Sequence, residues 1–168
     1  MAPEQGTIVV VGAPGAGKTT VGQALADRLG LRFADVDAVI VDRAGKPIAE
    51  IFADEGEDAF RALEEQVTAE LLDEAGVLAL GGGAVLSPRT REALRGHRVV
   101  WLRVGLAAAV KRVGMDTARP LLLGNVRGRL LALLNERAPL YADVATQVID
   151  TDELDPATVA ERIAASDA

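Results

Sequence analysis

Eight consecutive residues near the start of the chain have the types and the spacing of a phosphate-binding loop. The stretch Gly12–Thr19 reads GAPGAGKT and fills every fixed position of the pattern G-x-x-x-x-G-K-[ST]. Its glycines allow backbone conformations that a Cβ would block, so that successive N–H groups can point at one anion. In such a loop the lysine, here Lys18, reaches the terminal phosphates of a nucleotide, and the hydroxyl of Thr19 binds Mg²⁺.

The residues on either side place this loop at a strand-to-helix turn. Residues 7–11 read TIVVV, a β-branched apolar run typical of a strand that is buried on both faces. From Thr20 to Leu29 the apolar residues recur at helical spacing, and Gly30 provides the stop. The unpaired N–H groups and the positive dipole end of that helix favour an anion, so the sequence predicts a phosphate site.

Two carboxylates follow the next predicted strand. Asp35 and Asp37 stand at positions i and i+2 in the stretch FADVD. Because ligands bind at the carboxyl ends of parallel strands, we expect this pair to face the phosphate loop, one near the metal and one near an acceptor hydroxyl. The alternative is that Asp37 only caps the following helix, and the residues alone do not decide between the two.

A run of three glycines and a few arginines offer further anion-binding groups. Gly81, Gly82 and Gly83 come directly after an apolar run, where they could bring the backbone against a ligand or simply form a tight turn. Guanidinium groups bind carboxylate or phosphate in a bidentate manner, although a single arginine is more often a surface charge. The arginines that do not fall obviously on solvated helix faces are Arg61, Arg119 and Arg137, of which the last two precede turns with proline.

Composition limits the classes of function. The chain has 168 residues, 49% of them hydrophobic and 26% charged, which fits one folded domain spanning 1–168. The absence of cysteine excludes a disulfide framework and a cysteine-ligated metal, and the single histidine argues against a metal site built on histidines. The net charge of −7 argues against a nucleic-acid partner. Neither a secretory leader nor a membrane-spanning apolar run is apparent, so we expect a cytoplasmic enzyme without a membrane partner.

The alternation of strand and helix patterns predicts an α/β fold, three-layer with a five-stranded parallel sheet. The core is expected over about 7–166, and the irregular segment at about 113–124 as a mobile lid. The strands are expected at Thr7–Gly12, Arg32–Asp35, Val77–Leu80, Arg98–Val104 and Thr146–Asp150. The helices are expected at Lys18–Leu29, Asp37–Ala44, Pro47–Asp54, Glu57–Ala75, Pro88–Leu94, Leu106–Val113, Arg127–Arg137 and Pro156–Ser166.

Taken together and in this order, the motifs resemble those of the shikimate kinases, from about Ile8 to Pro156. The segments that carry the resemblance are GAPGAGKTT, the Asp35–Asp37 pair, IF with EGE and FR at residues 51–61, LGGG at 80–83, RPLL at 119–122, RAPLY at 137–141 and DTD at 150–152. The resemblance implies a nucleoside-monophosphate-kinase-like P-loop kinase fold with sheet order 2-3-1-4-5. It also implies transfer of the γ-phosphoryl group of ATP to the 3-hydroxyl of shikimate, by a monomer.

The same resemblance assigns roles to individual residues. Catalysis would fall to Lys18, Asp37 and Arg119, while Thr19 would bind Mg²⁺ directly and Asp35 through water. ATP would be bound by Gly15, Ala16, Gly17, Lys18, Thr19, Thr20, Arg112, Arg119 and Pro156. Shikimate would be bound by Asp37, Arg61, Gly81, Gly82, Gly83 and Arg137, with a substrate-binding subregion at about 35–61.

Two features depart from the family pattern, and two other functions remain open. Val41 stands where shikimate kinases often carry a glutamate, and the adenine loop Asp152–Pro156 is acidic where relatives often carry arginine. A kinase of another small acid, above all gluconate, would use the same fold. A nucleotide-binding switch without phosphoryl transfer is the other alternative, although the Asn-Lys-x-Asp stretch typical of guanine specificity is absent.

Overall fold

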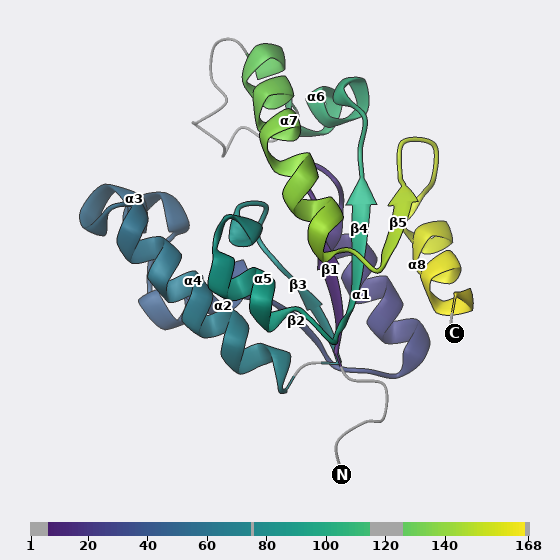
Figure 1. Ribbon diagram of the computed structural model, residues 1–168, viewed down its shortest axis with the longest axis horizontal. Helices are drawn as coiled ribbons and strands as arrows, with labels where there is room; N and C mark the ends of the chain where they lie inside the picture. Colours follow the sequence, from purple (N-terminus) through teal and green to yellow (C-terminus); the bar gives the residue numbers. More distant parts are fainter. Residues whose placement is uncertain (1–6, 75, 115–125, 167–168) are drawn as a thin grey trace.

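The computed structural model describes residues 7–74, 76–114 and 126–166, in which strands and helices alternate (Figure 1). The strands are β1 (Ile8–Val11), β2 (Phe33–Asp35), β3 (Val77–Ala79), β4 (Arg98–Arg103) and β5 (Gln147–Asp150). The helices are α1 (Lys18–Leu29), α2 (Val36–Ala44), α3 (Ile48–Glu55), α4 (Glu57–Leu72), α5 (Pro88–Ala93), α6 (Leu106–Gly114), α7 (Val126–Val144) and α8 (Pro156–Ala165), with a 3₁₀ turn, η1, at Ala84–Leu86.

The five strands form one parallel sheet in the order β2-β3-β1-β4-β5, which confirms the predicted fold class and strand order. The central strand β1 pairs with β3 on one side and β4 on the other, so that Ile8 lies opposite both Val77 and Arg98. All four residues of β1 are buried, as the unbroken β-branched run predicts for a strand covered on both faces.

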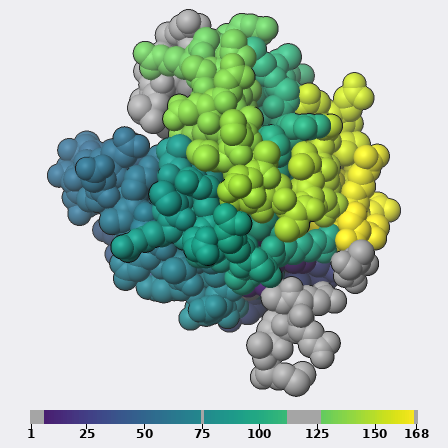
Figure 2. Space-filling model, viewed as in Figure 1, coloured from purple at the N-terminus to yellow at the C-terminus, as the bar shows by residue number. Residues whose placement is uncertain are grey.

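Helices cover both faces of the sheet and complete three layers. Helices α1 and α8 pack together on one face, and α4, α5 and α7 lie over the other (Figure 1). Leu25 of α1 and Leu78 of β3 are among the fully buried residues of the core between the layers. On the side of the strands' carboxyl ends, the surface is notched between α3 and α7 (Figure 2).

Helix α7 differs most from its predicted bounds. The sequence predicts a helix that ends at Arg137, before Pro139, but the helix continues through Pro139 to Val144. A proline inside a helix costs about 3 kcal/mol, because it removes a hydrogen bond and crowds the preceding turn. Burial of Leu130 and Tyr141, which are 0% and 1% exposed, ties the helix to the core on both sides of Arg137 and offsets that cost.

One further element and one predicted segment differ from the expected organisation. The 3₁₀ turn η1 was not predicted; it follows the three glycines, where Leu86 N–H donates to the carbonyl of Gly83 at 3.1 Å. The expected lid at about 113–124 lies outside the described residues, apart from the last residues of α6. Among the helices of the described ranges, none has the length and apolar character needed to span a membrane.

Candidate active site

The loop between β1 and α1 has the backbone that its glycines were expected to provide. Gly15 and Gly17 adopt positive φ angles of 83° and 87°, a region that residues with a Cβ rarely enter. A Cβ on Gly12 would lie 2.7 Å from the carbonyl oxygen of Leu102 on the neighbouring strand. Here glycine is therefore required by the turn itself and by the close approach of two strands' backbones.

The side chains of this loop make two sets of contacts. The Lys18 ammonium group donates hydrogen bonds to the carbonyl oxygens of Gly12 and Ala13, at 2.8 and 3.0 Å. The Thr19 hydroxyl donates to a carboxylate oxygen of Asp35 at 2.5 Å, which joins the start of α1 to the end of β2. The expected convergence of the loop and the first carboxylate at the strands' carboxyl ends is thus present.

Asp35 and Asp37 have different positions. Asp35 is the N-cap of α2, where its side chain accepts a hydrogen bond from Ala38 N–H at 3.2 Å. Asp37, which the sequence left as a possible cap, instead lies in the first turn of the helix. A Cβ on Gly81 would lie 2.8 Å from Asp37 Oδ1, so this carboxylate is directly against the glycine run.

The glycine run is also where the two predicted substrate arginines meet. A Cβ on Gly83 would lie 2.6 Å from both terminal nitrogens of Arg61, and one on Gly82 would lie 3.3 Å from Nη1 of Arg137. Helix α4 supplies Arg61 and α7 supplies Arg137, from opposite sides of the run. The structure therefore brings together the whole predicted set: Asp37, Arg61, Gly81, Gly82, Gly83 and Arg137.

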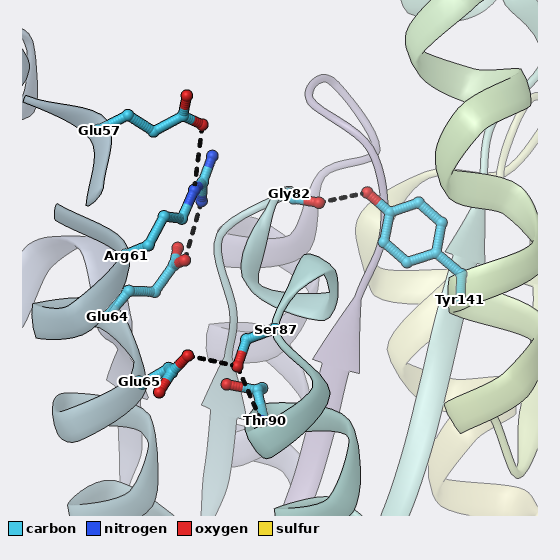
Figure 3. A network of polar contacts seen from close by, with 8 residues as sticks. All are labelled: Glu57, Arg61, Glu64, Glu65, Gly82, Ser87, Thr90 and Tyr141. Carbon is cyan, nitrogen blue, oxygen red and sulfur yellow. Dashed lines mark hydrogen bonds and ion pairs between the residues drawn. The ribbon is translucent and has the colours of Figure 1, made fainter. Parts of the chain in front are cut away.

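A buried glutamate, Glu64, completes this cluster. Its side chain is 4% exposed and accepts a hydrogen bond from Arg61 Nη1 at 2.8 Å, while Glu57 pairs with Arg61 Nε at 3.5 Å (Figure 3). Burial raises the pKa of the Glu64 carboxyl, against the opposing effect of Arg61 and with a smaller upward contribution from Asp37. Glu64 thus lies close enough to Asp37, Arg61 and Arg137 to interact electrostatically with all three.

Each of the two arginines has a donor without a hydrogen bond, although Nε of Arg61 also lies 3.5 Å from Glu57 as an ion pair. Among the described residues, Nε of Arg61 and Nε of Arg137 are buried without a hydrogen-bond partner. An unsatisfied buried donor costs about 1–3 kcal/mol, and more when the group is charged. Unpaired donors of this kind, next to a backbone without side chains, are typical of a site that binds an anionic ligand.

Tyr141 supports the glycine run from α7. Its hydroxyl donates a hydrogen bond to the carbonyl oxygen of Gly82 at 2.6 Å (Figure 3). The ring is 1% exposed and lies 5.7 Å from the ring of Trp101, centroid to centroid. Burial raises the pKa of Tyr141 to about 12, although the charge of Arg137 and a hydrogen bond with it act in the opposite direction.

Comparison with known proteins decides the family. The family model for shikimate kinase matches residues 14–167. The chain is 59% identical over 157 residues to a shikimate kinase of Thermobifida fusca, covering 93% of this chain and 91% of that one. The chain belongs to the shikimate kinase family. A shikimate kinase of Mycobacterium avium is 50% identical over 165 residues, covering 97% and 92% of the two chains.

A solved structure of a shikimate kinase supports the same assignment at the level of the fold. The shikimate kinase from Acinetobacter baumannii in complex with shikimate has a TM-score of 0.91 and 40% sequence identity, and the match covers 96% of this chain and 92% of that one. At this level of similarity the family resemblance noticed in the sequence is confirmed, together with its fold.

The residues predicted for the nucleotide are placed only in part. Gly15 to Thr20 form the loop and the start of α1, and Pro156 begins α8. Arg112 belongs to the backbone of α6, but its side chain lies outside the described part of the structure, as does the whole of Arg119. Their roles in this shikimate kinase family member stay predictions from the sequence.

Two residues of the site received no role from the sequence. Glu64 stands in a run of charged helix residues, and only its i,i+3 spacing from Arg61 could have indicated that the two pair. Tyr141 was noted as part of a matching segment, but its hydrogen bond joins residues 59 positions apart. Such a contact depends on how α7 packs against the sheet, which no local pattern reports.

Proposed function

We propose that this kinase transfers the γ-phosphoryl group of ATP to the 3-hydroxyl of shikimate, giving shikimate 3-phosphate and ADP. The observation that carries the proposal is that the phosphate loop and the arginine-lined glycine run adjoin. A Cβ on Gly82 would lie 3.1 Å from Cδ of Pro14 and 3.5 Å from the carbonyl oxygen of Gly12. A nucleotide in the loop and an acid held by the arginines would therefore be neighbours.

The acceptor site suits a small hydroxylated carboxylic acid. Arg61 and Arg137 bind the carboxylate through their terminal nitrogens, which lie against Gly83 and Gly82, as guanidinium groups do in bidentate pairs. The run of three glycines has no side chains, which lets a flat ring approach the backbone. Asp37, beside Gly81, accepts a hydrogen bond from the reacting hydroxyl and is the candidate base.

At the donor site, Lys18 exchanges its bonds to the carbonyls of Gly12 and Ala13 for the β- and γ-phosphates. Thr19 and Asp35 present adjacent hydroxyl and carboxylate oxygens, the hard ligands that Mg²⁺ prefers. We infer that Thr19 would bind Mg²⁺ directly and Asp35 through water. The metal ion supplies charge that neutralises the phosphate oxygens.

Phosphoryl transfer has a loose transition state, so catalysis depends mainly on alignment and on neutralising charge. In this arrangement Lys18 stabilises negative charge on the transferring group. Arg61 and Arg137 fix the carboxylate end of the acceptor, and Asp37 orients the hydroxyl toward the phosphorus. Fixing both reactants in one geometry supplies much of the rate acceleration that such enzymes need.

An ADP-release assay tests the proposal, with MgATP and, separately, shikimate, gluconate, a nucleoside monophosphate or no acceptor. We expect release with shikimate alone, and its loss in Lys18→Ala and in Arg137→Ala. Arg28→Ala is the matched control, because Arg28 is a surface residue that forms a 3.9 Å ion pair with Glu161. Preferential release with gluconate would reject the proposed substrate while leaving the fold intact, and nucleotide binding without a product would favour a switch.

A further inference from the structure

We propose that Tyr141 is a positioning residue for the acceptor site, whose hydroxyl fixes the carbonyl of Gly82 and the guanidinium group of Arg137 relative to each other. The inference rests on the proposed function, since it concerns how the shikimate site keeps its shape. Tyr141 acts through these two groups, from α7 at the side of the run (Figure 3).

The first step concerns which groups donate hydrogen bonds to the three carbonyls of the glycine run. Gly81 accepts a hydrogen bond from Ala84 N–H at 3.1 Å, and Gly83 accepts one from Leu86 N–H at 3.1 Å, both within the turn that follows. The carbonyl of Gly82 accepts its bond from the Tyr141 hydroxyl instead, at 2.6 Å. Because glycine has the largest backbone freedom of any residue, the middle peptide depends on this side chain for its orientation.

The second step is the geometry of α7. Arg137 and Tyr141 are four residues apart and so lie on the same face of the helix. Burial raises the pKa of the phenol while the charge of Arg137 lowers it, and Nη1 of Arg137 lies 3.3 Å from the Cβ position of Gly82, whose carbonyl the phenol binds. Arginine can only donate, so toward Arg137 the phenol oxygen can act only as an acceptor, and its own proton goes to the carbonyl of Gly82.

The third step is that packing holds the Tyr141 ring in place. The ring of Tyr141 is 1% exposed and packs against Trp101, which restricts its rotation. Burial holds the phenol in its protonated form well above neutral pH, so the donor to Gly82 is retained over the working range of the enzyme. Productive binding geometries need to be held within about 0.5 Å, and a locked phenol can provide that precision.

The test is Tyr141→Phe, which keeps the buried ring and removes the hydroxyl. We expect the KM for shikimate to rise roughly 10-fold, with kcat reduced less than about 3-fold and the KM for ATP unchanged. Thr7→Val is the matched control. The Thr7 hydroxyl donates to the carbonyl oxygen of Leu72 at 2.6 Å, so this variant also loses a buried hydroxyl-to-carbonyl bond, but at the opposite end of β1 from the phosphate loop.

A second measurement separates positioning from general loosening of the fold. In an Arg137→Lys background, Tyr141→Phe should change the KM for shikimate less than about 3-fold, because the guanidinium group that it orients is gone. A wild-type KM for shikimate in Tyr141→Phe, an equal rise of both KM values, or full additivity with Arg137→Lys would each overturn the inference. If the unmodified chain does not phosphorylate shikimate at all, the proposed function fails instead.

Discussion

At the scale of single residues, glycine-to-alanine substitutions can distinguish an effect on substrate binding from an effect on stability. Gly83 of the glycine run gives the first case. A Cβ on Gly83 would meet the terminal nitrogens of Arg61 at 2.6 Å, which are the far end of a flexible side chain. Gly83→Ala is therefore expected to fold normally and to displace the guanidinium group, raising the KM for shikimate at least about 10-fold. Steady-state kinetics together with the melting temperature would check this, and an unchanged KM would contradict it.

Gly12 gives the contrasting case and serves as the control for stability. Its added Cβ would meet the backbone carbonyl of Leu102 at 2.7 Å, where no rotamer change can relieve the contact. Gly12→Ala is expected to lower the free energy of unfolding by about 1–3 kcal/mol, as overpacking against rigid structure does, and so to lower the melting temperature. Gly12 also has a φ of 155°, which residues with a Cβ rarely adopt, whereas Gly83 has a φ of −97°. The difference between the two variants therefore reports both the backbone conformation and the rigidity of the neighbouring atoms.

The pKa of Tyr141 predicts a pH dependence of stability. Burial raises it from the ordinary 10.0 to about 12, so the folded state holds the phenolic proton more tightly than the unfolded state does. This contribution is complete below pH 10 and is lost as the pH rises through 12, a change of about 3 kcal/mol. Denaturant unfolding across this range should show that the wild type loses more stability than Tyr141→Phe. Parallel curves of unfolding free energy against pH for the two proteins would refute the raised pKa of Tyr141.

At the scale of elements, the loop between β5 and α8 is attached to the loop after β4. Thr151 N–H donates to the carbonyl of Arg103 at 3.0 Å, which continues the pairing of the two strands by one residue. Beyond it, the Asp152 carboxylate accepts a hydrogen bond from Gly105 N–H at 2.7 Å. The sequence resemblance places the adenine at this loop, so the two loops together would form its border.

Loss of that attachment should affect the nucleotide alone. In Asp152→Ala the Gly105 N–H loses its acceptor and the loop gains freedom, so we expect the KM for ATP to rise several-fold with the KM for shikimate unchanged. Glu153→Ala, at the exposed neighbouring position, is the control. Titration of ATP at saturating shikimate would make the measurement, and equal KM values in both variants would count against a role of the loop in binding the base.

At the scale of the whole molecule, the fold could be predicted because its signals are local. An unbroken apolar run predicts a strand buried on both faces, as β1 is, and Gly30 ends α1 where the sequence indicated. The site could be predicted in part because the carboxyl ends of parallel strands meet at one edge, which brings Thr19 to Asp35.

The remainder depends on packing between distant elements. The extension of α7 through Pro139 and the pairing of Glu64 with Arg61 in a buried space follow from tertiary contacts, which can override local preference. The sequence also did not determine whether Asp35 or Asp37 caps α2, because both are aspartates and aspartate suits an N-cap position. Arg112 and Arg119 remain predictions, because their side chains are not described.

Ligand binding should stabilise the whole fold. Shikimate contacts α4, α7 and the glycine run in the proposed site, so it binds the folded chain only. At 100 times its Kd it should add about 2.7 kcal/mol to the unfolding free energy. This corresponds to roughly 5–10 °C in melting temperature for a chain of this size. The shift should vanish in Arg137→Ala and persist in Arg28→Ala, and an equal shift in both variants would argue for binding elsewhere.

The contact between the rings of Trp101 and Tyr141 gives the molecule an optical property as well. Trp101 is the single tryptophan of the chain, 9% exposed, and its neighbour is hydrogen-bonded to the backbone of the acceptor site. Indole fluorescence responds to the polarity and motion of its immediate surroundings. The protein therefore carries an intrinsic fluorophore that is linked through Tyr141 to Gly82 of the proposed acceptor site. We expect ligand binding there to change the Trp101 emission in unlabelled protein without any turnover.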